Sequence, residues 1–140
     1  MDIQIPSILI FQGARLQITF EDTNPSNRTS REIMIMGNRE GFLSLANTLI
    51  FCVNDLVDVI PLHEMQFVTS DFNLLIAVDE ANISRGGIVE PNANGFIWSF
   101  SEDALCLTAT NIHSLGYANP ELHLDSDKLF EDISVYCVVG

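Results

Sequence analysis

Short segments in which apolar and polar residues alternate make up most of this chain, and such alternation is typical of β-strands buried on one side. The pattern predicts strands near 3–10 and at 15–20, 32–36, 72–79, 96–100, 105–110, 122–125 and 133–139. Polar segments rich in turn-forming residues separate them and predict loops, among them 22–30 and 80–94. A single helical turn is expected at 128–132.

A change in the spacing of apolar residues predicts one amphipathic helix at about 39–54. Asn38 suits the N-cap position, and the carboxylate of Glu40 suits the positive end of a helix. The apolar side chains recur every three or four residues, at Phe42, Leu45, Ala46, Leu49, Cys52, Val53 and Leu56.

The segment 101–104 predicts a tight turn, so the strands at 96–100 and 105–110 should form a β-hairpin. Phe96, Trp98 and Phe100 would then share one face of their strand. An aromatic row is more often part of a core, but an exposed row would be a binding surface, and the sequence leaves both interpretations open.

One long helix among many short strands predicts an α+β fold in a single domain spanning 1–140. We expect a mostly antiparallel sheet with the helix packed on one face. The segments 61–63 and 121–123 are alike, since each precedes a strand and ends in histidine. This likeness is either chance or the remnant of a duplication.

Acidic residues outnumber basic ones by 19 to 6, which gives a formal net charge of −13. Residues 1–40 hold five acids and four bases, so the rest of the chain holds fourteen acids and only Arg85 and Lys128 as bases. Such a chain repels phosphate backbones and anionic lipid, and it attracts basic proteins. Neither a nucleic-acid partner nor a membrane partner is therefore expected.

Several classes of protein are not indicated by the sequence. No apolar run reaches the roughly 18–20 residues of a membrane-spanning helix, and Asp2 stands where a signal peptide would be basic, so a cytoplasmic protein is expected. Cys52, Cys106 and Cys137 lie among apolar residues and are expected to be buried free thiols. Phosphate-loop, calcium-loop and serine-hydrolase motifs are missing, so neither a cofactor nor enzymatic activity is expected.

The histidines suggest one alternative. His123 would share a strand face with Glu121 and Asp125, and His63 and His113 could complete a metal site for a hydrolase. A solvated polar side of an amphipathic strand explains the same residues, and we favour it because the three histidines have no ligand spacing.

We expect a partner to contact the acidic turn at 102–103 and the loops and strand near the C-terminal end, because loops often carry recognition residues. The predicted contact residues are Glu102, Asp103, His113, Tyr117, Glu121, His123, Asp125, Asp127, Glu131 and Asp132.

Residues 37–49, GNREGFLSLANTL, resemble a segment of small bacterial immunity proteins of polymorphic toxin systems. There a strand ends at glycine and enters a helix through a similar E-G-hydrophobic-x-x-L-A-x-x-L sequence. The resemblance implies a cytoplasmic inhibitor that binds one cognate toxin, and many such toxins are basic nucleases. It covers this segment alone, so it assigns no contact residues.

The leading hypothesis is therefore a small acidic binding protein, in the form of an immunity protein that covers the site of a basic toxin. Two alternatives remain at this point. One is a metal-dependent hydrolase that uses His63, His113, His123 and Asp125. The other is a structural subunit of a homo-oligomer. A homodimer is compatible with this alternative and also with the leading hypothesis.

Overall fold

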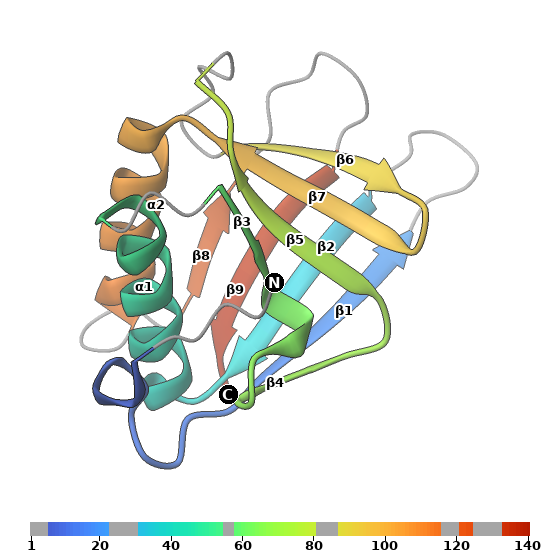
Figure 1. Cartoon of the computed structure of the whole chain (residues 1–140). Helices are drawn as coiled ribbons and strands as arrows, with labels where there is room; N and C mark the ends of the chain where they lie inside the picture. Colours follow the sequence, from blue (N-terminus) through green and yellow to red (C-terminus); the bar gives the residue numbers. More distant parts are fainter. Residues whose placement is uncertain (1–5, 23–30, 55–57, 81–86, 116–120, 125–132) are drawn as a thin grey trace.

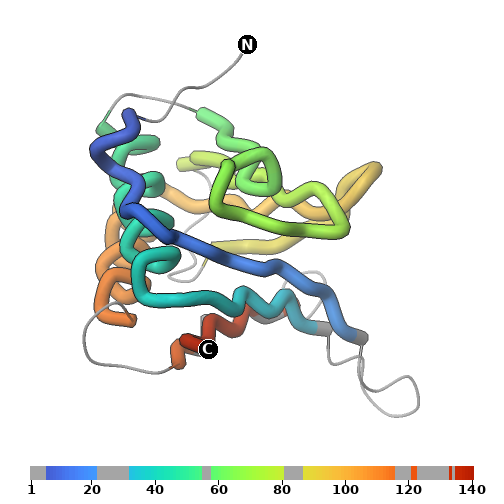
Figure 2. The backbone as a smooth tube through the Cα atoms, turned by 90° about the horizontal axis from the view of Figure 1, so that it is seen from below, coloured from blue at the N-terminus to red at the C-terminus, as the bar shows by residue number. Residues whose placement is uncertain are grey.

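Two β-sheets face each other, and a pair of helices stands along one side of both (Figure 1). The computed structural model describes residues 6–22, 31–54, 58–80, 87–115, 121–124 and 133–140. Seen from below, the helices again lie beside the sheets, and β1, β2 and β9 lie beneath the four-stranded sheet (Figure 2).

The five-stranded sheet has the order β4-β1-β2-β9-β8. Its strands are β1 (Leu16–Asp22), β2 (Arg31–Gly37), β4 (Val68–Ser70), β8 (Glu121–Leu124) and β9 (Ile133–Val139). The pairs β1–β2 and β8–β9 are antiparallel, whereas β1–β4 and β2–β9 are parallel.

The four-stranded sheet has the order β3-β5-β7-β6. Its strands are β3 (Val59–Pro61), β5 (Asn73–Val78), β6 (Ile88–Asn92) and β7 (Gly95–Phe100). Here β5 and β7 are parallel, and the two outer pairs are antiparallel. The α+β prediction is confirmed, but both sheets are mixed, so the prediction of a mostly antiparallel sheet is only partly right.

The helix α1 (Arg39–Asn54) has the predicted bounds and the predicted cap. Asn38 Oδ1 accepts a hydrogen bond from the Gly41 backbone N–H at 2.8 Å, as an N-cap should. The buried residues extend around much of its circumference, because residues before β1 cross its outer side. Phe11 N–H donates to Ser44 Oγ at 2.8 Å, and Asn47 Nδ2 donates to Leu9 O at 2.9 Å.

A second helix, α2 (Glu102–Leu115), replaces the predicted hairpin. Ser101 caps it, since Ser101 Oγ accepts from the Ala104 N–H at 3.2 Å and Ser101 O accepts from Leu105 N–H at 2.9 Å. The apparent alternation at 105–110 is misleading because Leu107 points to solvent while Thr108 is fully buried. The helix packs on α1, so the prediction of one main helix is wrong (Figure 1).

Two further predictions differ from the structure. Residues 88–92 form β6 rather than a loop. Pro91 has no N–H to donate, and it is tolerated here because β6 is an edge strand that pairs with a neighbour on one side only. Residues Ser7–Leu9 form a short 3-10 helix, η1, rather than part of a strand. A second such helix, η2, spans Leu62–Glu64, and the helical turn expected at 128–132 lies outside the described residues.

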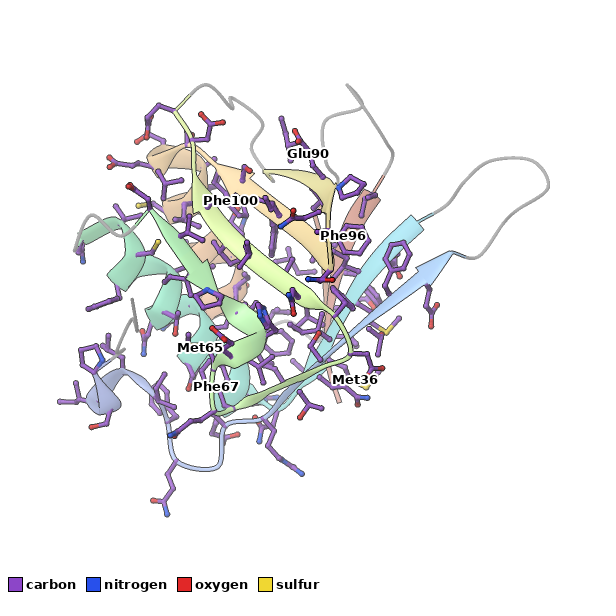
Figure 3. The ribbon with its side chains drawn as sticks, turned by 45° about the vertical axis from the view of Figure 1, so that its right-hand side comes forward. Met36, Met65, Phe67, Glu90, Phe96 and Phe100 are labelled. Atoms are coloured by element: carbon purple, nitrogen blue, oxygen red, sulfur yellow. The ribbon has the colours of Figure 1, made fainter. Side chains whose placement is uncertain are left out.

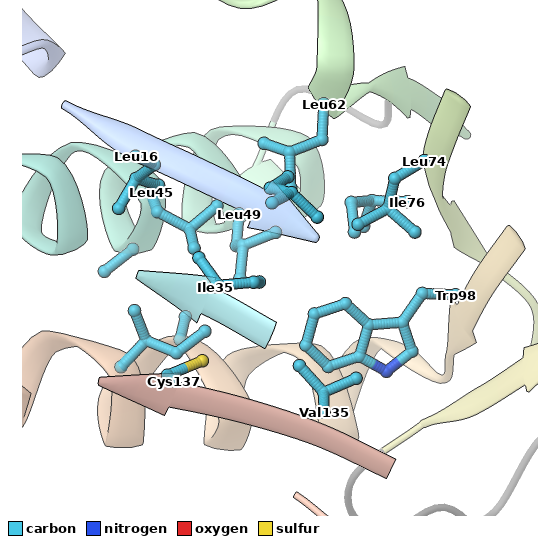
Figure 4. Packing of buried hydrophobic residues seen from close by; sticks show 14 of the residues in the cluster. Leu16, Ile35, Leu45, Leu49, Leu62, Leu74, Ile76, Trp98, Val135 and Cys137 are labelled. Carbon is cyan, nitrogen blue, oxygen red and sulfur yellow. The ribbon is translucent and has the colours of Figure 1, made fainter. Parts of the chain in front are cut away.

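The core fills the space between the sheets and the helices (Figure 4). Trp98 and Phe100 are fully buried and 4.7 Å apart between ring centroids, so the aromatic row of β7 belongs to the core. Phe96, the third member, is half-buried and packs on Phe20 and Phe72, with centroids at 4.7 and 5.5 Å.

The two halves of the chain have the same topology. The first runs through the hairpin β1–β2, α1 and the pair β3–β5, and the second through β6–β7, α2 and β8–β9. Each half adds its last strand, in parallel, to the hairpin of the other. An equivalent hydrogen bond follows the end of each added strand. After β9, Gly140 N–H donates to Gly37 O at 2.9 Å, and after β5, Asp79 N–H donates to Phe100 O at 2.7 Å.

The helix cores agree residue by residue. Counted from the caps Asn38 and Ser101, six buried positions coincide: Gly41 with Ala104, Phe42 with Leu105, Leu45 with Thr108, Ala46 with Ala109, Leu49 with Ile112, and Cys52 with Leu115. This agreement favours a duplication. When the two halves are aligned through their strand registers, His123 of β8 corresponds to Pro61 of β3 and not to His63. The two histidines therefore do not occupy equivalent positions.

Candidate functional site

The outer face of the five-stranded sheet, which we call the open face, carries the outward side chains of five neighbouring strands. No other described helix or strand lies beneath this sheet in Figure 2. Its described side chains are Gln17, Thr19, Glu21, Glu32, Met34, Met36, Thr69, Glu121, Tyr136 and Val138.

Two carboxylates lie directly opposite each other on this face. Glu21 of β1 pairs in register with Glu32 of β2, and alternation places both side chains on the outside, opposite the buried Ile33 and Ile18. Like charges in directly opposite positions destabilise a sheet. A positive charge placed between them by a ligand or a partner would remove that repulsion.

A third carboxylate, Glu121, lies on the edge strand β8. The Tyr136 hydroxyl donates a hydrogen bond to Glu121 Oε2 at 2.5 Å. That hydrogen bond, then desolvation, and then the negative charges of Glu121 and Glu32 raise the pKa of Tyr136. The open face is thus a region of negative potential on three strands.

Apolar side chains occupy the middle of the open face. Met36, labelled in Figure 3, is 42% exposed, and the register places it between Gln17 and Val138. Met34 lies in the next row, between Thr19 and Tyr136, and is half-buried. Methionine adapts its shape to a binding partner more readily than other apolar side chains do.

One end of the open face is hollowed. The hollow has a volume of about 460 Å³ and is lined by residues of β1, β2 and β4 and of the segment before β4. Arg15, Gln17, Gln66 and Thr69 supply polar groups to it, and Met36 supplies an apolar wall. Arg15 is exposed, so this end of the face carries the opposite charge from the Glu21 end.

Glu102 and Asp103, predicted as contacts, lie elsewhere, in the first turn of α2. There the backbone N–H of Glu102 donates to Glu80 Oε1 at 3.0 Å, and Asp79 follows the end of β5 beside them. Carboxylates at a helix N-terminus are stabilised by the helix dipole, which explains this group without a ligand.

The other predicted contact residues are distributed differently. His113 is exposed in the last turn of α2, while Glu121 and the backbone of His123 belong to β8 at the border of the open face. The remaining ones lie outside the described residues: Tyr117, Asp125, Asp127, Glu131 and Asp132.

The described histidines do not meet. His63 lies in η2, where its Nδ1 accepts a hydrogen bond from the Leu74 N–H at 3.0 Å, whereas His113 borders a shallow depression between α1 and α2. Within the described part of the chain, no group of three His, Cys, Asp or Glu side chains could hold a metal ion. No observation therefore favours the hydrolase alternative, whose His123 and Asp125 side chains are not described.

None of the three cysteines forms a disulfide bond. Burial, with a smaller effect of the Asp58 charge, raises the pKa of Cys52 to about 11, and burial raises the pKa of Cys137 to about 12. Both are buried as predicted, and both are weak nucleophiles because they remain protonated. Cys106 is half-buried on α2, so the prediction of burial is wrong for that thiol.

Sequence reasoning missed most of the open face, including Glu21, Glu32, Met34, Met36 and Tyr136. Alternation within each strand does show which residues share a side of that strand. Strand order, however, is needed to bring the outward residues of β9 beside those of the β1–β2 hairpin, because β9 lies about a hundred residues further along the chain.

The segment that resembles immunity proteins has a structural role in this fold. A side chain at Gly37 or at Gly41 would collide with the backbone carbonyl of Arg15, so both positions need glycine. The Asn38 side chain forms two hydrogen bonds to the same backbone segment: its Oδ1 accepts from Arg15 N–H at 3.0 Å, and its Nδ2 donates to Gly13 O at 2.7 Å. Close packing at the strand–helix junction thus accounts for these residues.

Comparison with known proteins gives no further guide. No family model, no curated protein and no solved structure matches this chain. In the part of the chain that the structure describes, no helix has the length and apolar character to cross a membrane.

Proposed function

We propose that this chain is a non-enzymatic binding protein whose partner is a protein with a basic surface. The observation that carries the proposal is the excess of exposed carboxylates over exposed cations among the described residues. Arg15 and Arg39 are the exposed basic residues there. The exposed acids are Glu21, Glu40, Asp58, Glu64, Asp71, Asp79, Glu80, Glu90, Glu102, Asp103 and Glu121.

This charge affects association more than folding. An uncompensated negative surface repels itself and lowers the stability of the free protein, and a basic partner relieves that repulsion. The same field accelerates encounter with a positively charged protein and slows encounter with an acidic one. A stability cost that only a partner removes supports a binding role.

The resemblance at 37–49 suggests a more specific form of the proposal. In that form the chain is a cytoplasmic immunity protein that covers the active site of a cognate basic toxin. Inhibition by occlusion needs no catalytic group on the inhibitor, so it is compatible with a binding surface alone. The test of this form is to express the product of the neighbouring gene with and without this chain. Growth should stop when that product is expressed alone and should be restored when this chain is expressed with it.

Salt dependence of binding tests the general proposal. The partner is isolated by affinity capture from the organism that encodes the chain, and its association is followed by surface interferometry. The association rate should fall by at least about tenfold between roughly 25 and 300 mM salt. A tight partner whose association rate does not change over this range would refute the role of the acids.

A further inference from the structure

We infer that the open face is the surface that receives this basic partner. The occupant is a protein segment that places Lys or Arg beside Glu21 and Glu32 and an apolar side chain on Met34 and Met36. The inference rests on the proposed function, and it adds where the partner binds and what it presents.

Charge complementarity provides the first argument. Glu21 and Glu32 are opposite each other in the register, and no cationic side chain is described beside them on this face. Opposed carboxylates are unfavourable in the free protein and become favourable when a cation lies between them. A partner cation is therefore worth more here than beside an isolated surface acid.

The apolar centre provides the second argument. Met34, Met36, Tyr136 and Val138 form two adjacent rows on neighbouring strands, and the carboxylates lie around them. An apolar centre with a polar rim is the usual arrangement of a protein–protein interface. Scattered acids alone would attract a basic partner without fixing its position.

Other described surfaces lack opposed carboxylates beside apolar side chains. Val59 of the edge strand β3 is 42% exposed next to the exposed Asp58, but no pair of opposed carboxylates is described there. The first turn of α2 is acidic, but Leu107 is the one large exposed apolar residue described on that helix. Much of α1 is covered by α2 and by the segment before β1. Ile8 and Phe11 are exposed, but no carboxylate is described among their nearest sequence neighbours.

Arg15 sets the direction of the bound segment. It lies immediately before β1 and Glu21 lies near the end of β1, about 20 Å away at the rise of an extended strand. The basic residues of the partner should therefore lie toward Glu21 and Glu32 rather than over the hollow. The hollow, lined by amides, a hydroxyl and Arg15, accommodates a neutral or acidic part of the partner.

The test uses a short synthetic peptide of alternating lysine and leucine as the probe. It is titrated into the full ¹⁵N-labelled chain at low salt, and amide chemical shifts locate the contact. The largest changes should fall on β1, β2 and β9, around Glu21, Glu32 and Met36. Because the mapping uses the unmodified protein, it does not depend on any variant folding.

Matched variants separate this face from general charge. Glu32→Gln and Glu90→Gln change the net charge equally, and Met36→Ser and Leu107→Ser remove apolar side chains that are 42% and 45% exposed. The open-face variants should weaken peptide binding by at least about fivefold, and the controls by less than about twofold. Circular dichroism confirms that each variant is folded.

The outcomes distinguish the two proposals. Binding with shifts centred on Glu102 and Asp103, or equal losses in all four variants, would overturn the open face but leave a basic partner standing. No saturable binding of the peptide at low salt would overturn both. Sedimentation should show a monomer. A dimer that Met36→Ser abolishes would instead mean that a second copy of this chain occupies the open face.

Discussion

Glu21 and Glu32 face each other directly across β1 and β2, with both side chains on the open face. The repulsion between them predicts that Glu32→Gln stabilises the free protein by about 0.2–1 kcal/mol. Urea unfolding at low salt measures the gain, which should shrink at about 1 M salt because ions screen the pair. Glu90→Gln is the control for net charge, and a loss of stability in Glu32→Gln would contradict the prediction.

Asn38 holds α1 and the chain before β1 together, so its loss should cost more than the loss of an ordinary cap. Asn38→Ala removes hydrogen bonds to Gly41, Arg15 and Gly13, which predicts a loss of about 2–3 kcal/mol. Ser101→Ala removes one bond at the equivalent position of α2 and should cost about 1 kcal/mol. Chemical denaturation compares the two, and equal losses would show that the bonds to residues 13 and 15 add nothing.

Gly87 needs to be glycine for two reasons. Its φ is +78°, and an added Cβ would lie 2.6 Å from Trp98 Nε1 and 2.7 Å from the Phe100 ring. Gly87→Ala should therefore lower the unfolding free energy by about 2–4 kcal/mol and change the tryptophan fluorescence. Gly13→Ala is the matched control, because its φ is +81° with nothing within 4 Å, and it should cost only about 1–2 kcal/mol. Similar losses at both sites would argue against the clash with the aromatic pair.

The buried thiols make the fold sensitive to alkali. Cys52 and Cys137 have pKa values of about 11 and about 12 in the folded chain and ionise near 9 when unfolded. Above pH 9 the unfolded chain therefore binds fewer protons than the folded chain. Their contribution to stability is complete below pH 9 and is lost as the pH rises toward 11 and 12, by up to about 1.4 kcal/mol per pH unit for each thiol.

Cys137→Ala should flatten this dependence. Urea unfolding between about pH 8 and 10.5 measures the slope, and the variant should lose about half of the thiol contribution. The comparison uses slopes, because the alanine also leaves a cavity that lowers stability at every pH. Identical slopes in the variant and the parent would mean that Cys137 ionises normally in the folded chain.

Thiol alkylation should distinguish Cys106 from the other two cysteines. Cys106 is half-buried on α2, whereas Cys52 and Cys137 are fully buried and protonated. Iodoacetamide at neutral pH should therefore modify one thiol per chain within the native state and all three in denaturant. Mass spectrometry of tryptic fragments identifies the site, and native modification of Cys137 would contradict the described core.

Local patterns predicted the elements whose burial follows one simple period. The apolar spacing and cap of α1 predicted its bounds, and β1, β2, β5, β7, β8 and β9 were each predicted close to their observed positions. The pattern failed at α2 because the buried Thr108 was counted as polar and the exposed Leu107 as apolar. Ser101 followed by Glu102 and Asp103 is a helix-start signal that could have corrected this error.

For the candidate site, the residue types and the negative charge follow from the order of amino acids along the chain, and the alternation within each strand shows which residues share a side. The geometry of the face depends on strand order, which tertiary packing sets, because the parallel pairing of β2 with β9 joins residues about a hundred positions apart. No local propensity encodes such pairing; it depends on burying both sheets and both helices around one core. That burial is what turns the scattered Glu21, Glu32, Met36 and Tyr136 into a single surface.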